Sequence, residues 1–341
     1  MPGTRSASLP APRSTHWLDR AYAALSSRHK LFSEGWGDER VIESLASGRF
    51  FADEIAAIGP AFGPARREGS LEVRDGSCTS PLSRLPDATR TMHLRWLRAS
   101  ASSGPTTLSA RATQPRRAAL LLAGSREEGY GRRTSVFAPL AREGIDLFLL
   151  ENPFYGLRRP PGQVGGNVRT VAEQMLLNLG MIEESRSLLA WMAQRHERIT
   201  IAGYSMGGHM ALCAGVLAGR DVGIAAMAAG SSPVPIYTRD LLSRSVDFEA
   251  LARSRGTTID DARARLAELF GRADATLLPP PRVPSRAVLV AIERDGYVSL
   301  AECERLHAHW PGSTLRRVPG GHVSAMFTQR AALRSAVRDT A

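Results

Sequence analysis

The segment Gly203-Tyr204-Ser205-Met206-Gly207 places a serine between two glycines, each two residues away. An apolar run precedes this segment and a helical pattern follows it, which is the context of a serine nucleophile held in a sharp strand-to-helix turn. Such a turn projects the serine hydroxyl above the sheet, and the glycines let the two backbones approach. The N-terminus of the helix would add partial positive charge beside an oxyanion. The segment therefore predicts that Ser205 is a catalytic nucleophile.

A serine hydroxyl needs a general base, and that base needs an acid to orient it. His322 is the expected base, because it follows the last apolar run of the chain on the glycine-rich loop that begins at Pro319. A histidine there can reach a serine at the same edge of a parallel sheet. Three other histidines follow Ser205 and are expected to pack locally or to face solvent: His209, His307 and His309.

The expected acid is Asp295, which follows the apolar run 287–292. The stretch from Asp295 to His322 is long enough for one helix and one strand. The chain order serine, acid, histidine is also the order found in enzymes whose serine nucleophile lies in a strand-to-helix turn. Glu293 competes with Asp295 for this role. Two other carboxylates lie in a different segment and are less well placed: Asp240 and Asp247.

An oxyanion hole needs two backbone N–H donors. One is expected from Met206, the residue after the nucleophile, and the other from the loop at Gly124 and Ser125, which follows an earlier apolar run. Gly124 is also a candidate substrate contact.

Two further candidates for substrate binding follow the apolar run 145–150, at the end of a strand where open α/β sheets bind ligands. We expect Tyr155 and Arg158 to line an acyl or headgroup pocket. The alternative is that Tyr155 packs in the core and Arg158 pairs with a carboxylate.

Short apolar runs alternate with helical patterns in the second part of the chain, which predicts parallel βαβ units in a doubly wound, mostly parallel sheet. Such runs suit strands that are buried on both faces. The expected strands are 71–74, 90–97, 118–123, 145–150, 199–202, 287–292 and 314–318, and the expected helices among them are 136–143, 168–195, 206–219 and 299–309.

The rest of the chain is expected to add helices to this sheet. Residues 1–15 predict a disordered tail, and residues 16–69 a helical extension with helices at 16–30 and 38–58. The hydrolase-like unit would be 70–341, with a helical insertion at 231–284 before the strand that carries the acid. The insertion is either a lid over the site or a plain surface excursion.

Composition limits the partners. The chain has 341 residues and a formal net charge of +11, but its basic residues are arginines, apart from Lys30, and they are spread along the chain without a nucleic-acid-binding motif. We therefore expect no nucleic-acid partner. The three cysteines predict neither a disulfide framework nor a metal site. The chain shows no secretory signal and no membrane-spanning run, so we expect a cytoplasmic protein, with peripheral membrane contact as an option.

Several segments together resemble one family, the alpha/beta-hydrolase domain-containing protein 18 family. The resemblance covers nearly the whole chain, from Lys30 to the last helix. Its most specific segments are Leu150-Glu151-Asn152-Pro153-Phe154-Tyr155-Gly156 with Arg158 or Arg159, Pro160 or Pro161 and Gln163, then Ser205-Met206-Gly207-Gly208-His209-Met210, Trp310-Pro311-Gly312 and Gly320-Gly321-His322-Val323-Ser324-Ala325. One segment departs from the family pattern: Ser125-Arg126-Glu127-Glu128 stands where the family has a Thr-Gly-Asp-His-like stretch, so the oxyanion loop and the substrate are expected to differ.

The resemblance implies an α/β-hydrolase fold with an N-terminal helical extension, and the same triad of Ser205, Asp295 and His322. The triad predicts hydrolysis of a carboxylic ester, and a lipid acyl ester is preferred because of the possible lid and because the resemblance implies a lipid-directed family. No metal or cofactor is implied. Two alternatives stay open: a non-catalytic binding module with this fold, and an acyltransferase that uses the same triad.

Overall fold

The computed structural model describes residues 15–47, 51, 53–100 and 115–341. Its described part is built on one mixed sheet with the strand order β1-β3-β4-β6-β5-β7-β8-β9-β10, and β2 pairs with β3 outside this path. The strands are β1 (Ala61–Phe62), β2 (Arg66–Glu68), β3 (Leu71–Thr79), β4 (Thr91–Ala99), β5 (Arg117–Leu122), β6 (Ile145–Leu150), β7 (Arg198–Tyr204), β8 (Gly223–Met227), β9 (Ala287–Ile292) and β10 (Thr314–Val318).

The sheet has an antiparallel part and a parallel part. β1 and β2 each pair antiparallel with β3. β3 also pairs antiparallel with β4, and β4 with β6. From β6 through β10 every pairing is parallel. The strands from β5 to β9 are almost wholly buried, as expected for parallel strands that are covered on both faces.

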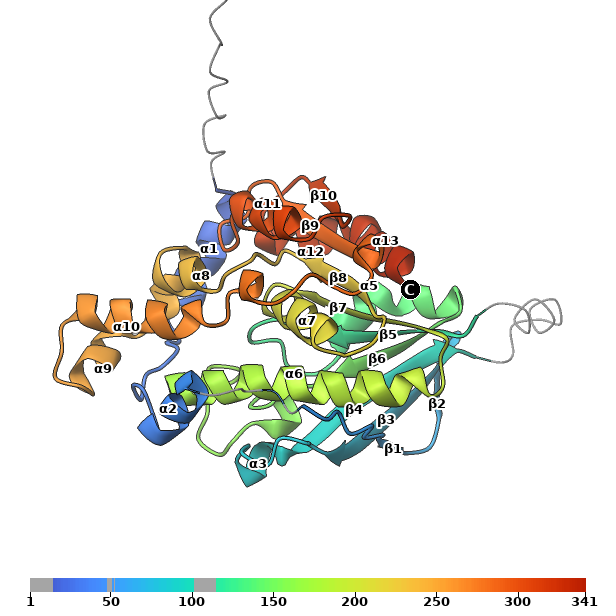
Figure 1. The fold of residues 1–341 in the computed structure, drawn as a ribbon, viewed down its shortest axis with the longest axis horizontal. Helices are drawn as coiled ribbons and strands as arrows, with labels where there is room; N and C mark the ends of the chain where they lie inside the picture. The colour runs from blue at the N-terminus through green and yellow to red at the C-terminus, as the bar shows by residue number, and fades with distance from the viewer. Residues whose placement is uncertain (1–14, 48–50, 52, 101–114) are drawn as a thin grey trace, which may run out of the picture.

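Helices cover both faces of the sheet (Figure 1). Alternate residues of β5 show the two faces: Leu120 and Leu122 pack in the core with α6 (Val171–Ala193) and α7 (Met206–Val216), whereas Leu121 packs in the core with α5 (Gly131–Arg142) and α13 (Arg330–Thr340). The prediction of a doubly wound, mostly parallel α/β sheet is therefore confirmed. Three further helices belong to this unit: α3 (Asp87–Arg90), α11 (Leu300–His309) and α12 (His322–Thr328).

The N-terminal segment is helical where the structure describes it, but less so than its periodicity predicts. α1 covers Trp17–Ser26 and α2 covers Glu39–Ser47. The helix expected over 38–58 is wrong in its second half, because residues 53–60 form no helix. Gly59 and Pro60 are poor helix formers and close this stretch. The predicted tail at 1–15 lies outside the described residues, apart from Thr15.

The segment 231–284 contains α8 (Val234–Thr238), η2 (Leu241–Ser245), α9 (Phe248–Arg253), α10 (Ile259–Gly271) and η3 (Ala275–Leu277), and η4 (Pro284–Arg286) follows it. α10 begins with a capping box formed by Thr258 and Asp261. This insertion packs against the N-terminal segment: Glu39 of α2 forms ion pairs with Arg255 and Arg265. Figure 1 shows α9 and α10 of the insertion at the same end of the molecule as α2.

The segment before the insertion contains β8, which the sequence patterns did not reveal. Three of its five residues are glycine or alanine, and Gly223 is needed because a Cβ there would lie 2.1 Å from the Thr340 carbonyl oxygen. In the part of the chain that the structure describes, none of the helices has the length and apolar character needed to cross a membrane.

Candidate active site

Ser205 lies in the turn between β7 and α7 with φ 58° and ψ −125°. These backbone angles are unfavourable for a residue with a Cβ, and such strain is typical of functional turns. The flanking glycines are required by close packing. A Cβ on Gly203 would lie 2.2 Å from the carbonyl carbon of Gly207, and a Cβ on Gly207 would lie 2.7 Å from the Ala123 oxygen. The sequence therefore encodes this turn through its glycines.

The three predicted triad residues come together at the carboxyl edge of the sheet. His322 Nε2 lies 2.9 Å from Ser205 Oγ, and His322 Nδ1 lies 2.7 Å from Asp295 Oδ2. The second oxygen of Asp295 accepts hydrogen bonds from the backbone amides of Tyr297 (2.7 Å) and Val298 (2.8 Å). This arrangement fixes the tautomer in which Nδ1 donates to Asp295 and Nε2 accepts from the serine hydroxyl.

The imidazole of His322 is held in a negative environment. Burial on its own would lower the pKa of His322, but the charge of Asp295, the hydrogen bond to it and the charge of Asp19 together raise that pKa above its ordinary value. The side chain of Asp295 is only 1% exposed, so solvent screens the pair weakly. The arrangement favours an imidazolium that forms when His322 takes a proton.

Three residues that sequence reasoning missed surround His322. The Tyr204 hydroxyl donates to the His322 carbonyl at 2.6 Å, and the rings of Tyr204 and Tyr297 lie 5.3 and 4.9 Å from the imidazole. Asp19 of α1 accepts the His322 backbone amide at 2.8 Å. Tyr204 directly precedes the nucleophile, which was a signal of proximity, but nothing in the sequence placed Asp19 near this loop.

The two residues predicted as oxyanion donors, Met206 and Ser125, both line the pocket at Ser205. Met206 begins α7, so its amide is one of the N-terminal N–H groups that a helix leaves free. Ser125 lies in the loop after β5 and lines the same pocket as Ser205 and Met206. The loop turns sharply at Arg126, which has φ 60°. It therefore brings Ser125 to the nucleophile without the glycine run used in other versions of this site.

Gly124 does not fit the predicted role of substrate contact. It is buried, and its amide donates to Glu127 Oε2 at 3.1 Å. Glu127 is in turn held by Arg133, at 3.1 Å, within the core beneath the loop. The Gly124 amide is thus used by the protein, which leaves the residues after it to face the pocket.

Arg158 does not line the pocket, so this prediction was wrong. The structure shows the alternative, in which Arg158 pairs with a carboxylate. Arg158 is fully buried and forms a two-pronged ion pair with Glu184 of α6, at 2.8 and 2.6 Å. The remaining guanidinium N–H groups donate to the carbonyls of Thr89 and Glu151. Arg158 thus joins the 3₁₀ turn η1 (Gly156–Arg158) to α6 and to α3.

Tyr155 is likewise buried, with 1% of its surface exposed, and does not line the pocket at Ser205. The Ser125 side chain and the Arg126 backbone near its hydroxyl lower the pKa of Tyr155, but burial is the stronger influence and raises it. Tyr155 therefore packs behind the oxyanion loop and supports it, so the core alternative describes it better than the pocket role.

The three other histidines make local hydrogen bonds: His307 and His309 are half-buried where solvent exposure was expected, and His209 also lines the pocket at Ser205. His209 is buried, with ring nitrogens 3.1 Å from the Gly230 carbonyl oxygen and 3.0 Å from the Ala273 carbonyl oxygen. It links α7 to the insertion. His307 contacts Ser313, and His309 contacts the Leu278 carbonyl.

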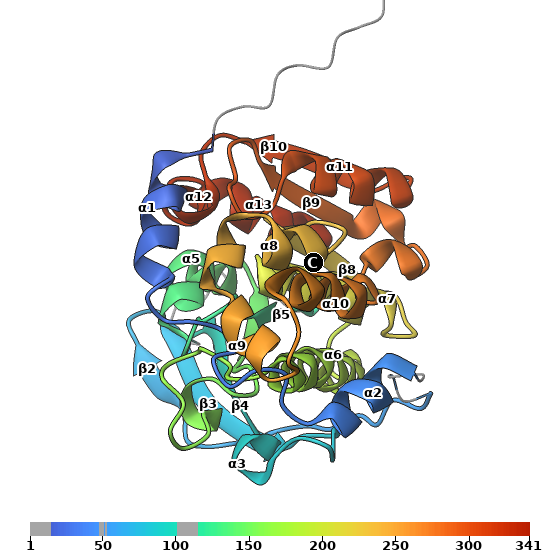
Figure 2. The ribbon, with the colours of Figure 1, turned by 90° about the vertical axis from the view of Figure 1, so that its left-hand side faces the viewer.

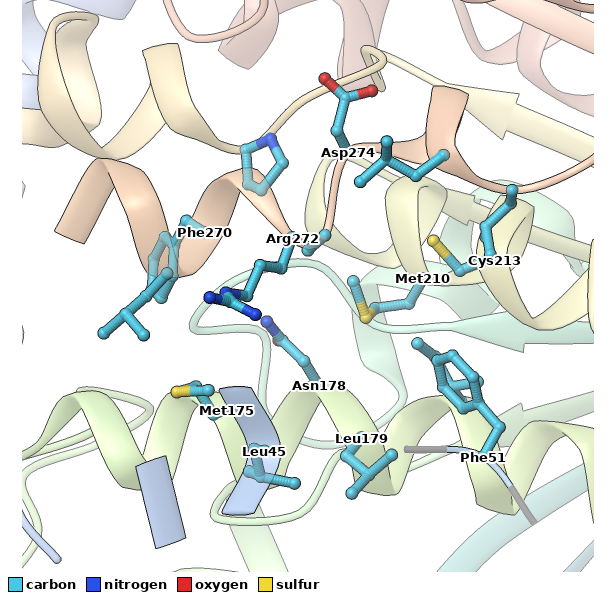
Figure 3. Close-up of a pocket in the computed structure, with 16 residues that line it drawn as sticks. Leu45, Phe51, Met175, Asn178, Leu179, Met210, Cys213, Phe270, Arg272 and Asp274 are labelled. Carbon is cyan, nitrogen blue, oxygen red and sulfur yellow. The ribbon is translucent and has the colours of Figure 1, made fainter. Parts of the chain in front are cut away.

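A small pocket at Ser205 adjoins a larger apolar cavity. The cavity has a volume of about 140 Å³ and shares four lining residues with the pocket: Asn178, Met210, Pro233 and Ala273. Figure 3 shows its walls: Met175, Asn178 and Leu179 from α6 face Phe270 and Arg272 from the insertion. α2, α6, α7 and the insertion all contribute to this cavity.

The strand order and the position of the sharp turn are those of the α/β hydrolases. The chain belongs to the alpha/beta hydrolase domain containing 18 family, whose model matches residues 29–255 and 252–341.

Among solved structures, the chain resembles acetyl xylan esterase 1 from Thermoanaerobacterium sp. JW/SL YS485, with 12% identity, a TM-score of 0.52 and coverage of 93% of this chain and 98% of that one. It also resembles an acetyl xylan esterase from Paenibacillus sp. R4, with 14% identity, a TM-score of 0.52 and coverage of 92% and 98%. At such low identity these two likenesses show the fold alone.

Proposed function

We propose that this protein is a serine hydrolase that cleaves carboxylic esters through Ser205, His322 and Asp295. The observation that carries the proposal is the continuous hydrogen-bonded arrangement of these three side chains, at 2.9 and 2.7 Å, at the end of a strained turn. A serine in such a turn needs an adjacent base to become a nucleophile, and the base needs an acid to orient it. The hydrogen-bonded order of serine, histidine and aspartate supports the proposal.

In the proposed reaction, His322 Nε2 takes the proton of Ser205 while Oγ attacks the ester carbonyl. The amides of Met206 and Ser125 donate to the oxyanion of the tetrahedral intermediate. The imidazolium then protonates the leaving alcohol as the carbon–oxygen bond breaks, which gives an acyl-enzyme. Water, deprotonated by His322, attacks the acyl-enzyme, and the acid leaves as Ser205 recovers its proton. Asp295 offsets the imidazolium charge in both halves.

The substrate that we propose is an ester with an apolar acyl group, such as a lipid acyl ester. The cavity beside the Ser205 pocket supports this, because its lining is mostly aliphatic, aromatic and sulfur-containing side chains. A cavity of about 140 Å³ is close in size to apolar cavities of about 150 Å³ that bind benzene. The acyl group would enter the cavity past Asn178 and Met210, and the alcohol part would face the pocket mouth.

The test is the intact mass of the protein after treatment with a fluorophosphonate, compared with Ser205→Ala. We expect one adduct on the natural protein and none on the variant, together with a loss of ester turnover of several orders of magnitude. Ser135→Ala, a hydroxyl removed from the exposed face of α5, is the matched control and should label normally. A folded natural protein that takes no adduct would contradict the proposal and favour a non-catalytic binding module.

A further inference from the structure

Asp19 is a fully buried carboxylate on α1, far from the hydrolase core in sequence. Its oxygens accept three backbone hydrogen bonds: from His322 at 2.8 Å, from Val323 at 2.9 Å and from Gly296 at 3.0 Å. His322 and Val323 begin the loop helix α12, and Gly296 directly follows Asp295. One side chain from the N-terminal segment thus binds the backbone of both loops that carry the base and the acid.

The amides of His322 and Val323 need such a partner. The first turn of a helix leaves its N–H groups without partners in the helix, and a side-chain oxygen at the N-cap normally accepts one of them. The N-cap of α12 is Gly321, which has no side chain. Asp19 therefore caps α12 from another element, and its negative charge lies at the positive end of the helix.

The fit between α1 and these loops is close. A Cβ on Gly321 would lie 2.3 Å from the Cβ of His16 and 2.7 Å from Asp19 Oδ2, so the contact requires glycine there. A Cβ on Gly296 would lie 2.5 Å from the side chain of Thr15. The His16 amide also donates to the Arg294 carbonyl at 3.0 Å.

The other end of α1 reaches the oxyanion loop. Arg126, which directly follows Ser125, donates to the carbonyls of Ser26 and His29 at 3.3 and 3.0 Å. α1 therefore contacts the base loop, the acid loop and the oxyanion loop. Figure 2 shows α1 alongside α12 at this edge of the molecule.

We propose that Asp19 is a positioning residue for the reaction: by capping α12 and binding the Gly296 amide, it holds His322 and Asp295 in register with Ser205. This inference rests on the proposed function of the triad. Because proton transfer needs the imidazole within hydrogen-bonding distance of the serine, a shift of about 1 Å in the α12 loop would slow the chemical step on the order of 10²-fold. Substrate binding should change much less, since Asp19 lies outside the pocket lining.

Asp19 also acts on the imidazole through its charge. The charged or titratable groups that face His322 are Asp295, Asp19 and the phenols of Tyr204 and Tyr297. Of these groups, Asp295 and Asp19 both raise the pKa of His322 through their charge. Removal of the Asp19 charge should therefore lower the pKa of His322, a change that loss of packing alone does not predict.

The experiment compares Asp19→Asn with the natural protein in kcat, KM and the pH dependence of kcat/KM on a soluble ester. Asparagine keeps the shape of aspartate but can accept with only one of its two positions. We expect kcat to fall on the order of 10²-fold with KM nearly unchanged, and the acidic limb of the pH profile to move to lower pH. Ala23→Gly is the control, since it weakens α1 at a buried position without touching the carboxylate.

A loss of rate in Asp19→Asn no greater than in Ala23→Gly, with an unmoved pH limb, would overturn the proposal. If Asp19→Asn does not fold, Asp19→Ser supplies a smaller neutral acceptor at the same place and is measured in its stead. Fluorophosphonate labelling of the natural protein separates the two hypotheses. Absent labelling there contradicts the proposed function, whereas normal labelling of both proteins at equal rates contradicts only the role of Asp19.

Discussion

His322 is the residue whose protonation state would control the proposed chemistry. It acts as a base only when neutral, so turnover should fall as pH drops below its pKa. Burial opposes the charged form, but the charge of Asp295, the hydrogen bond to it and the charge of Asp19 outweigh burial and raise that pKa. The loss of activity on acidification should therefore begin at a higher pH than for an ordinary histidine.

The first prediction is a single acidic limb in kcat/KM with its midpoint above about 6.5, the ordinary histidine value. Below that midpoint the rate should fall about tenfold for each pH unit, because the neutral fraction of His322 does so. The measurement is hydrolysis of a soluble ester from about pH 5 to 9, with the rate of Ser205→Ala subtracted to remove spontaneous hydrolysis. A midpoint below that of free histidine would mean that burial outweighs the carboxylates.

At this scale the sequence identified the residues whose position follows from strand order. Ser205 and Asp295 follow the buried strands β7 and β9, and His322 follows the partly exposed edge strand β10. Parallel strands bring their carboxyl ends to one edge of the sheet. Asp19 could not be found this way, because it lies 303 residues from His322 and acts through a carboxylate-to-amide contact that leaves no periodic pattern. Its burial depends on tertiary packing alone.

At the scale of elements, the segment from Glu151 to Arg159 shows why position at a strand end was insufficient to identify a pocket. The segment does follow β6, but it packs as a scaffold: Asn152 donates to the Ala123 carbonyl at 3.2 Å, and Glu151 accepts the Gly129 amide at 2.8 Å. These contacts hold the loop before α5. The residues of the segment therefore support the oxyanion loop on the side away from the pocket.

The second prediction concerns the buried ion pair of Arg158 and Glu184. Arg158→Ala leaves a buried carboxylate without its partner, which should destabilise the protein by about 3–5 kcal/mol. Arg159→Ala is a matched control one residue away, since its pair with Glu128 is partly exposed, and should cost about 1 kcal/mol or less. The measurement is urea unfolding of all three proteins.

The outcome separates scaffold from pocket. If Arg158 acts only through packing, Arg158→Ala should lower stability while the KM for an ester stays near its natural value in protein that is still folded. A variant with unchanged stability and a raised KM would restore the pocket role that the contacts contradict.

At the scale of the whole molecule, the sheet was predictable and the enclosure of the site was not. The other buried parallel strands have a local apolar run, whereas three of the five residues of β8 are glycine or alanine, and the short strands β1 and β2 carry too few residues for a pattern. The insertion was predicted from a break in the alternation of strands and helices. Its contacts with α2, through Glu39 and Arg265, depend on the folded arrangement of both segments.

These contacts matter because they close the apolar cavity. The N-terminal segment contributes Leu45 and Phe51, and the insertion contributes Phe270 and Arg272, so neither the sheet nor its helices enclose the cavity alone. Arg272 also donates to the Ala46 carbonyl across this junction. We propose that the N-terminal segment and the insertion together form a cap over the site, which sets the size of the acyl group.

The last prediction tests that cavity. Leu179 is buried on α6 and points into it (Figure 3), so Leu179→Trp should fill much of the space without reaching the triad. We expect kcat/KM for acetate esters to stay within about threefold, and kcat/KM for esters of six or more carbons to fall by tenfold or more, since each methylene denied burial costs about 0.8 kcal/mol. The measurement is a series of nitrophenyl esters of increasing acyl length.

Leu157→Trp is the control, because Leu157 is 70% exposed and should leave the series unchanged. A parallel loss on all chain lengths in Leu179→Trp would point to a distorted site and not to a filled acyl pocket. An unchanged series would mean that the acyl group lies elsewhere. A selective loss on the longer esters would indicate that the cap and Ser205 act on the same substrate, because the cavity meets the Ser205 pocket at Asn178 and Met210.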